Sequence, residues 1–341
     1  LLYRKYRPAT FSEVVGQEHV IKTLQGALTT GRIGHAYLFT GPRGTGKTTL
    51  ARLLAKSLNC EKRAKDGDCD NSCSFCLAIN ENRSLDLIEI DAASNRGIDD
   101  IRSLKESALV SAPGGKYKVF IVDEVHMLTK DAFNALLKVL EEPPAGVVFI
   151  LATTEPHKIL ATVLSRVQRF DFKRLTPRQI LGKLKQMSKA EHVSIDVEGL
   201  TAIAASSDGA LRDAEVALSK VFASCGSEKT GLPAGREISS EDVYATLGLI
   251  PANYNSEFLS YLITNNKERA IDFVARIYSG GIDVEHFTAG FVEYLRKVLI
   301  HTISPAVLAS VGEELLDNDI KIIVTYSGAL TQEQLIRMLN A

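Results

Sequence analysis

The sequence has no apolar run of the length that a membrane-spanning helix needs, and no charged and then apolar leader opens it. It also has no excess of charge of either sign, because 40 Lys and Arg residues face 41 Asp and Glu residues and leave a formal net charge of −1. The first absence argues against a membrane protein, and we expect a cytoplasmic location. The second gives no support to nucleic-acid binding by the chain as a whole, so such binding must depend on a local patch.

What the sequence does contain is typical of a globular protein. Its 341 residues are 45% hydrophobic and 24% charged. A chain of this length and composition can form two or three domains, each with its own core.

Residues 41–48 read GPRGTGKT and match the phosphate-binding loop G-x-x-x-x-G-K-[ST] at every fixed position. The apolar run 36–39 precedes them and predicts a strand, so the loop joins a strand to a helix that begins near Gly46. Backbone N–H groups of the loop and the positive end of the helix dipole would hold phosphates. Lys47 would reach the β- and γ-phosphates, and Thr48 would bind Mg²⁺. The residues expected to hold the nucleotide here are Gly41, Pro42, Arg43, Gly44, Thr45, Gly46, Lys47, Thr48 and Thr49.

Residues 117–124 read YKVFIVDE, which predicts a buried strand that ends in two carboxylates. In a parallel α/β sheet the carboxyl ends of the strands are where ligands bind. Asp123 is suited to hold Mg²⁺, and Glu124 is placed to polarise a water for attack on the γ-phosphate. The sequence therefore favours hydrolysis over passive binding.

A third strand is predicted at 147–152, followed by Thr153 and Thr154. Thr154 is a candidate to orient the attacking water or to sense the γ-phosphate. Helical stretches alternate with these strands and give the βαβ rhythm of a parallel α/β sheet. The predicted helices are 46–58, 98–109 and 130–141.

Two arginines outside this core have positions that suggest function. Arg166 follows the third strand in Leu164-Ser165-Arg166, and an arginine there suits a finger that acts on a neighbour's nucleotide. Arg212 opens a helix in a separate helical region, from which it could fold back onto the bound phosphates.

Four of the five cysteines, Cys60, Cys69, Cys73 and Cys76, lie within 17 residues. A disulfide is disfavoured in a cytosolic ATPase, and four thiolates suit a tetrahedral Zn²⁺ site of structural type. Reduced free thiols are the alternative. Cys225 stands alone and reads as a packed thiol.

Many segments together carry a family resemblance: Tyr6-Arg7-Pro8, 11–17 (FSEVVGQ), 35–39 (HAYLF), the loop 41–48, 89–94 (EIDAAS), 123–144, 152–154, 164–166 and 211–214 (LRDA). With them the chain resembles the gamma/tau ATPase subunits of bacterial DNA polymerase III clamp loaders, within the AAA+ ATPases. The similarity is dense from residue 1 to about 215 and thin afterwards.

The resemblance implies roles for particular residues. It makes Thr154 the first sensor, Arg166 the finger that acts in trans and Arg212 the second sensor. It also implies a four-cysteine zinc module at 60–76. Arg4, Arg7, Pro8, Val14 and Val15 are assigned to the adenine and ribose pocket.

The chain departs from the family pattern at two places. Val167 stands where the family usually has cysteine after the finger arginine. Three residues separate Cys69 from Cys73, where the family pattern has two.

The resemblance also implies a domain order. We expect an AAA+ P-loop domain with a parallel sheet at 1–174, a helical lid at 175–246 and a helical collar at 247–341. Helices are predicted at 177–191, 196–224, 258–263, 268–278 and 286–300, and a mobile loop at 226–240. Because the first residue is not Met and the family's collar usually continues further, we expect a trimmed chain.

The implied function is ATP-driven opening of a ring-shaped sliding clamp and its placement on primed DNA, within the DNA polymerase III holoenzyme. The cofactors would be ATP, Mg²⁺ and Zn²⁺. The partners would be other loader subunits, copies of this chain, the clamp and primed DNA. Arg96, Arg102 and Lys130 are candidates for contacts to the DNA backbone.

Two other classes share part of this pattern. A helicase would also have a phosphate loop and Asp-Glu-x-His, which stands here at 123–126, but it would need a second RecA-like domain where this chain is helical. A nucleotide-dependent scaffold without hydrolysis would have no need of Lys47, Thr48, Asp123 and Glu124 together.

Overall fold

The computed structural model describes residues 2–110, 112, 115–225, 237–279, 282–304, 306–307, 325 and 331–339. The chain forms two compact units. Unit 1 contains Leu1–Leu175 and Ser207–Val216, and unit 2 contains Thr176–Ser206 and Ala217–Ala341. The chain therefore leaves unit 1 after Leu175 and returns to it for one short segment.

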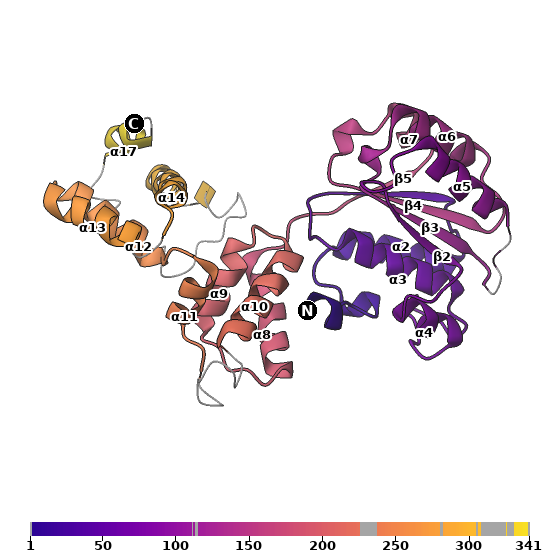
Figure 1. Cartoon of the computed structure of the whole chain (residues 1–341), viewed down its shortest axis with the longest axis horizontal. Helices are drawn as coiled ribbons and strands as arrows, with labels where there is room; N and C mark the ends of the chain where they lie inside the picture. The colour runs from indigo at the N-terminus through magenta and orange to yellow at the C-terminus, as the bar shows by residue number, and fades with distance from the viewer. Residues whose placement is uncertain are drawn as a thin grey trace. The chain divides into compact units, whose positions relative to one another are not determined.

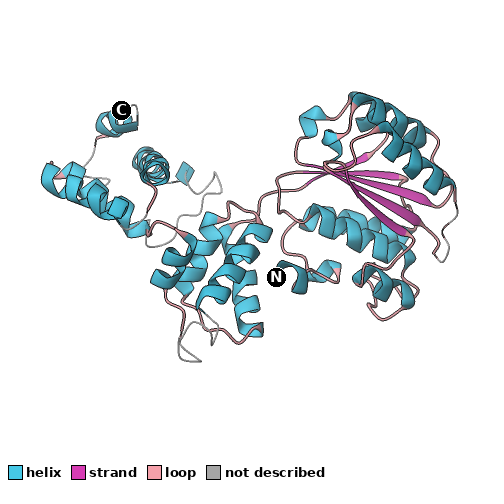
Figure 2. Cartoon of the chain, viewed as in Figure 1, coloured by secondary structure: helices cyan, strands magenta, loops and turns pink. Residues whose placement is uncertain are grey.

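Unit 1 is built on a sheet of five parallel strands in the order β2-β3-β4-β1-β5 (Figures 1 and 2). The strands are β1 (Ala36–Thr40), β2 (Leu87–Asp91), β3 (Lys118–Asp123), β4 (Val147–Thr153) and β5 (Gln168–Asp171). Thr40 of β1 pairs with Thr153 of β4, and Val122 of β3 pairs with Leu151 of β4. The carboxyl ends of the three central strands thus meet at one edge, next to the phosphate loop.

Helices cover both faces of the sheet (Figure 1). α2 (Glu18–Thr30) and α3 (Lys47–Asn59) lie on one face, and α5 (Ile98–Leu109), α6 (Lys130–Glu141) and α7 (Ala161–Leu164) lie on the other. The strands supply apolar side chains to both sides: in β1, Tyr37 and Phe39 pack with α2 and α3, whereas Leu38 packs with α5 and α6. Burial on both faces explains why the central strands are continuous apolar runs.

The predicted strands at 36–39, 117–124 and 147–152 are confirmed as β1, β3 and β4, and the predicted helices at 46–58, 98–109 and 130–141 as α3, α5 and α6. The sequence did not predict β2 and β5. Both lie at the edges of the sheet, where each strand has only one neighbour, and both carry exposed polar residues. Neither therefore has the apolar run by which a central strand is recognised.

A small insertion separates α3 from β2. It contains the four neighbouring cysteines and α4 (Ser74–Asn80), whose N-cap is Cys73. Short helical turns complete unit 1: α1 (Leu2–Lys5), η1 (Phe11–Glu13), η2 (Val125–Met127) and η3 (Pro156–Lys158).

The regular elements among the described residues of unit 2 are all helices, apart from one isolated bridge between Ile195 and Ile238. Its first helix, α8 (Pro177–Ala190), confirms the prediction at 177–191. It begins with a capping box in which Thr176 and Gln179 bind each other's backbone N–H, and proline fills the first position. α8 and α11 (Ser240–Leu247) both pack against α9 (Val197–Ser206).

The prediction of one helix over 196–224 is wrong. The segment forms α9 and then α10 (Leu211–Cys225), with a break at Asp208 and Gly209. Both residues of the break have positive φ, 48° and 75°, which ends a helix. The break also lets Ser207–Val216 return to unit 1.

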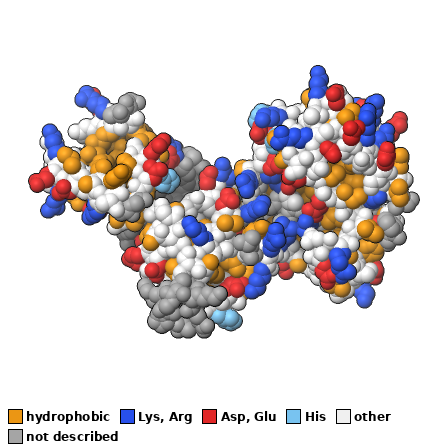
Figure 3. Space-filling view, in the orientation of Figure 1, with side chains coloured by type: hydrophobic (Ala, Val, Ile, Leu, Met, Phe, Trp, Pro, Cys, Tyr) orange, Lys and Arg blue, Asp and Glu red, His pale blue; other side chains and the backbone are white. Residues whose placement is uncertain are grey.

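The C-terminal helices are α12 (Ala252–Ile263), α13 (Lys267–Ser279), α14 (Val284–Ile303) and α17 (Gln332–Leu339). They contain the predicted stretches 258–263, 268–278 and 286–300, which are therefore confirmed. Phe273 is at the centre of their core, with its ring 5.3 Å from that of Phe258 and 5.5 Å from that of Phe287. Figure 3 shows apolar side chains also at the surface of this region, where Ile271 and Tyr278 of α13 are exposed.

Most of the predicted loop at 226–240 lies outside the described residues, which resume at 237. Ser239 then caps α11, so the end of the predicted loop is ordered. Among the described helices, none combines the length and the apolar character needed to cross a membrane.

Candidate functional site

The phosphate loop has the backbone that its glycines predict. Gly41, Gly44 and Gly46 have φ of 141°, 76° and 99°, values that other residues rarely adopt. A Cβ at Gly41 would lie 2.4 Å from the carbonyl oxygen of Phe172, so the loop also passes close to the segment after β5. α3 begins directly after Gly46, which leaves the N–H groups of its first turn free for a ligand.

Lys47 lies inside the loop and is buried. Its Nζ donates to the carbonyl oxygens of Gly41 and Pro42, each at 2.8 Å. Burial lowers the pKa of Lys47, and the carboxylates of Glu124 and Asp123 act in the opposite direction. The ammonium group is therefore close to both carboxylates that end β3.

Thr48 and Asp123 are in direct contact, with Thr48 Oγ1 donating to Asp123 Oδ2 at 2.8 Å. A hydroxyl and a carboxylate are the oxygen ligands that Mg²⁺ prefers. The residues present thus fit the ion, although they lie 75 positions apart in the chain.

Glu124 is held in place by the end of the neighbouring strand. It adopts the left-handed conformation, with φ of 47°. Its Oε2 accepts from Thr154 Oγ1 at 2.9 Å and from Thr154 N at 3.2 Å. His126 Nδ1 lies 3.3 Å from the same oxygen and 2.9 Å from Thr153 Oγ1. The candidate base and the candidate sensor are therefore partners in this state.

These groups surround a cavity of about 590 Å³ in unit 1. The predicted residues that line it are Arg7, Pro8, Val14, Val15, Arg43, Gly44, Thr45, Gly46, Lys47, Thr48, Thr49, Asp123, Glu124 and Arg212. Gly41, Pro42 and Thr154 are not part of the lining but contact residues that are. The carbonyl oxygens of Gly41 and Pro42 accept from Lys47 Nζ, and Thr154 Oγ1 donates to Glu124 Oε2.

The sequence reasoning missed part of the lining, namely Tyr3, Asp91, Ala93, Leu175, Leu211 and Glu215. Asp91 ends β2 and pairs in register with Asp123, so recognition of β2 as a strand would have pointed to it. Leu175 and Leu211 line the same cavity because the chain returns to unit 1 after Ser207, and no sequence pattern signals that return.

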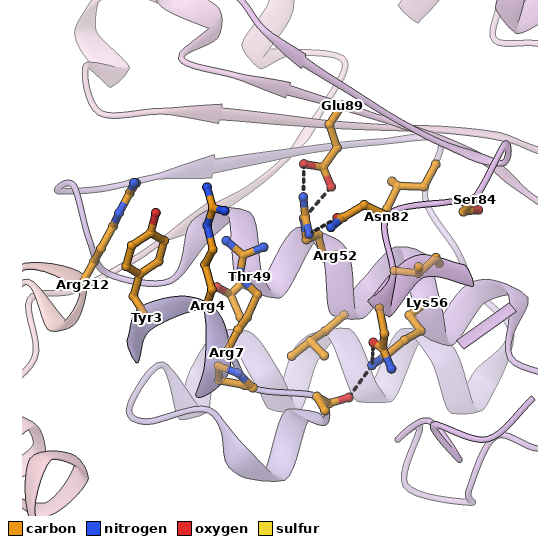
Figure 4. Close-up of a pocket in the computed structure, with 16 residues that line it drawn as sticks. Tyr3, Arg4, Arg7, Thr49, Arg52, Lys56, Asn82, Ser84, Glu89 and Arg212 are labelled. Atoms are coloured by element: carbon orange, nitrogen blue, oxygen red, sulfur yellow. Dashed lines mark hydrogen bonds and ion pairs between the residues drawn. The ribbon is translucent and has the colours of Figure 1, made fainter. Parts of the chain in front are cut away.

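A second cavity of about 810 Å³ shares residues with the first and is lined by Arg4, Arg7, Arg52 and Arg212 among others (Figure 4). The Tyr3 ring lies between two of these arginines, 5.8 Å from the Arg4 guanidinium and 5.1 Å from that of Arg212. A hydrogen bond from Arg4 lowers the pKa of the Tyr3 phenol. The contact with Tyr3 holds Arg212 at the border of both cavities.

Arg52 in the same cavity is already engaged. It pairs with Glu89, with Nη2 donating at 2.7 Å, and donates to Asn82 through Nη1 at 2.8 Å (Figure 4). Of the arginines labelled there, Arg4, Arg7 and Arg212 have no such carboxylate partner among the described contacts.

Arg166 lies away from this pocket, just after α7. Its Nη2 is 2.8 Å from Glu141 Oε1, and its Nη1 donates to the carbonyl oxygen of Thr162 at 2.7 Å. The side chain is about one third exposed (33%). The structure thus presents this arginine at the surface of unit 1, with its direction fixed by Glu141.

Cys60, Asp70, Cys73 and Cys76 bring their ligand atoms within 4.8 Å of one another. Zinc bonds to sulfur and oxygen ligands imply ligand atoms about 3.5 to 3.8 Å apart around a tetrahedral ion, so these four residues fit zinc. Cys69 is not in this group. It packs beside Cys73 and Cys76, but its Sγ lies 2.9 Å from Ser57 Oγ.

The strand order, the loop after β1 and the two carboxylates at the end of β3 fit an AAA+ P-loop nucleotide-binding domain. The solved structure of the Thermotoga maritima RuvB Holliday junction branch migration motor has this fold, with a TM-score of 0.53 and 20% identity over 77% of this chain and 80% of that one.

Two family models match the chain: "DNA polymerase III, delta subunit" over residues 16–176, and "DNA polymerase III subunits gamma and tau domain III" over residues 238–340. DNA polymerase III subunit tau of Bacillus subtilis is 39% identical over 99% of this chain and 58% of its own length. That of Escherichia coli is 39% identical over 91% of this chain and 47% of its own length. The chain therefore belongs to the gamma/tau family of DNA polymerase III subunits and spans about half the length of these relatives.

Proposed function

We propose that this chain is the ATP-hydrolysing motor subunit of a DNA polymerase III clamp loader, which opens a sliding clamp and places it on primed DNA. The observation that carries the proposal is that one pocket is lined both by Lys47 and Thr48 of the loop and by Asp123 and Glu124 at the end of β3. A scaffold that only binds nucleotide and Mg²⁺ would use Lys47, Thr48 and Asp123 but has no use for a base such as Glu124.

In this proposal ATP lies with its phosphates on the loop. Lys47 exchanges its two carbonyl partners for the β- and γ-phosphates, while Thr48 and Asp123 hold Mg²⁺. The ion would offset the charge of the phosphate oxygens. Pro8, Val14 and Val15 offer the apolar surface that suits a purine, and Leu175 and Leu211 extend it.

The Glu124 carboxylate must lose its hydrogen bonds from Thr154 before it can orient a water. A γ-phosphate that accepts a hydrogen bond from Thr154 Oγ1 would take that donor away from Glu124 Oε2 and free the carboxylate. The contact of 2.9 Å between the two side chains thus provides a way to couple phosphate sensing to activation of the base.

Arg166 is proposed to act in trans, on the nucleotide of a neighbouring subunit, and Arg212 in cis. The surface position of Arg166 supports the first assignment and the position of Arg212 in the pocket lining supports the second. Such fingers neutralise charge that develops on the transferring phosphoryl group.

The proposed partners are other loader subunits, copies of this chain, the sliding clamp and primed DNA, in the cytoplasm. The division into an ATPase domain at 1–174, a lid at 175–246 and a collar at 247–341 is part of the proposal. The match of residues 238–340 to a gamma/tau domain supports a boundary near 240.

Arg96, Arg102 and Lys130 remain the candidates for DNA contact. All three are exposed: Arg96 precedes α5, Arg102 lies in its second turn and Lys130 begins α6. The two segments are in contact, since Thr129 N donates to the Arg96 carbonyl oxygen at 3.1 Å. Reversal of all three charges is expected to weaken binding to primed DNA and to flatten its dependence on salt, as measured by fluorescence anisotropy. Unchanged affinity and slope would rule the three residues out.

We also propose a structural Zn²⁺ in the insertion between α3 and β2. The donor set of the cluster supports it, because three thiols and a carboxylate converge and no position is left for a reacting water. Zinc analysis of the protein purified without chelators tests this part, and less than half an equivalent would contradict it.

The first experiment on function is steady-state ATP turnover of this chain, alone and with loader subunits, clamp and primed DNA, with Lys47→Ala as the inactive control. We expect a low rate alone and a strong rise only in the full mixture. An ATP turnover rate that does not change when the clamp and primed DNA are added would contradict the clamp-loader proposal. Strand separation driven by ATP would support the helicase alternative, and binding without turnover in every mixture would support the scaffold.

A further inference from the structure

We propose that Asp70, and not Cys69, is the fourth zinc ligand, so that the metal centre has three thiolates and one carboxylate. The inference rests on the zinc part of the proposed function and concerns which residues hold the ion. It departs from a four-cysteine module, which the cysteine count alone would favour.

The first argument is the position of the ligand atoms. An oxygen of Asp70 lies within 4.8 Å of the Sγ atoms of Cys60, Cys73 and Cys76, and these distances hold between every pair of the set. Cys60 Sγ donates to Asp70 Oδ1 at 3.3 Å. The Sγ of Cys69 is not part of this group, although its residue is the neighbour of Asp70 in the chain.

The second argument is that Cys69 already has a partner. Its Sγ lies 2.9 Å from Ser57 Oγ, on the buried side of α3. Ser57 is fully buried, and this is the contact described for its hydroxyl. Rotation of Cys69 toward the metal would leave that hydroxyl unpaired, which is costly in a protein interior.

The third argument is that the carboxylate is already oriented. Ser72 Oγ donates to Asp70 Oδ2 at 2.9 Å, and Ser72 N donates to Asp70 Oδ1 at 3.3 Å. Partners of this kind fix the direction of a metal ligand. Asn71, between Asp70 and Ser72, adopts a left-handed turn with φ of 55°.

The charge of the centre is the same in both cases. Zinc with three thiolates and a carboxylate carries the same net charge as zinc with four thiolates, so the surroundings need not change. What differs is the number of sulfur ligands, which spectroscopy of the Co²⁺-substituted protein can count.

The test uses the whole chain, exchanged from Zn²⁺ to Co²⁺, with Cys69→Ala, Asp70→Ala, Asp70→Asn, Asp70→Cys and Cys73→Ser compared with the unaltered protein. The thiolate-to-Co²⁺ charge-transfer absorption reports the number of sulfur ligands. Zinc affinity is measured by competition with a chromophoric chelator, and circular dichroism verifies that each variant is folded.

We expect Cys69→Ala to leave the absorption and the zinc affinity unchanged, and Cys73→Ser to reduce both. Asp70→Ala and Asp70→Asn should keep the absorption per bound ion and weaken the affinity at least about tenfold. Asp70→Cys should raise the absorption by about one third, because a fourth thiolate is added.

Loss of about a quarter of the absorption in Cys69→Ala, together with no gain in Asp70→Cys, would overturn the assignment while leaving the zinc proposal intact. Unaltered protein that binds neither metal would instead overturn the zinc proposal and this assignment with it. The two failures are therefore distinguishable.

Discussion

At the scale of single residues, the site is held by contacts that a nucleotide must replace. Lys47 is bound to two carbonyl oxygens of its own loop, and Glu124 is bound to Thr154. Both groups are therefore positioned before any ligand arrives, but neither is free to act. The chemistry depends on which of these partners the phosphates displace.

Glu124→Gln should separate binding from hydrolysis. The amide keeps the shape of the side chain but cannot act as a base, so we expect turnover to fall by about 10²- to 10⁴-fold with ATP affinity nearly unchanged. Single-turnover hydrolysis and equilibrium binding of a fluorescent ATP analogue measure the two effects. Glu155→Gln is the matched control, because Glu155 lies at the same sheet edge but does not line the pocket. Equal losses in both variants would contradict the role of Glu124.

Glu141→Ala tests whether the direction of Arg166 matters. The pair is partly exposed, and pairs of this kind contribute less than about 1 kcal/mol. We therefore expect only about a two- to fivefold loss of turnover in the assembled complex, against a loss of about 10³-fold or more in Arg166→Ala. Nucleotide affinity of the isolated chain should be the same in both variants. A loss of affinity in either one would argue that Arg166 does not act in trans.

At the scale of elements, the site depends on a junction between the phosphate loop and the segment that follows β5. Gly41 has no room for a side chain there and has positive φ. Thr40 and Phe172 pair across the same junction, with Phe172 N donating to the Thr40 carbonyl oxygen at 2.7 Å. The edge strand β5 thus sets the position of the loop, although its own sequence is polar.

Gly41→Ala and Gly26→Ala should change stability in opposite directions. At Gly41 we expect a loss of about 1–3 kcal/mol from backbone strain, together with weaker ATP binding. Gly26 lies in α2 with ordinary φ and open space around it, so alanine there should add about 0.5–1 kcal/mol. Urea unfolding followed by circular dichroism measures both. A neutral Gly41→Ala would show that the junction is less tight than the structure indicates.

At the scale of the whole molecule, the two units have separate apolar cores. In unit 1, two hydrophobic clusters lie between the sheet and the helices on its two faces. In unit 2, the C-terminal helices share an aromatic cluster around Phe273. The nucleotide pocket is lined by residues of unit 1 alone. Damage to the second core should therefore leave nucleotide binding intact.

Phe273→Ala tests this independence. Removal of a buried phenylalanine should destabilise the C-terminal helices by about 3–5 kcal/mol, whereas ATP affinity should stay the same. Tyr278→Ala on the same helix is the control, because its side chain is 75% exposed and should change stability by less than about 0.5 kcal/mol. Urea unfolding and ATP binding are the measurements. Reduced ATP affinity in Phe273→Ala alone would contradict the separation.

The sequence by itself determined the phosphate loop, the central strands and the helices α3, α5, α6, α8, α12, α13 and α14. Each of these has a local signal: a fixed motif for 41–48, continuous apolar residues for β1, β3 and β4, and a 3.6-residue period for the helices. Those signals also gave Lys47, Thr48, Asp123 and Glu124, since polar residues at the ends of buried strands are expected at a ligand site.

Only the tertiary structure decided the rest. β2 and β5 form strands by pairing with β3 and β1, and as edge strands they have no apolar run of their own that would predict them. The break at Asp208 and Gly209 brings Leu211 and Arg212 back to the pocket, and the turn at Asn71 turns Asp70 toward three cysteines while Cys69 meets Ser57. In each case the contact that forms depends on residues distant in the chain or on one backbone angle. Residue type and spacing alone do not predict which contact that is.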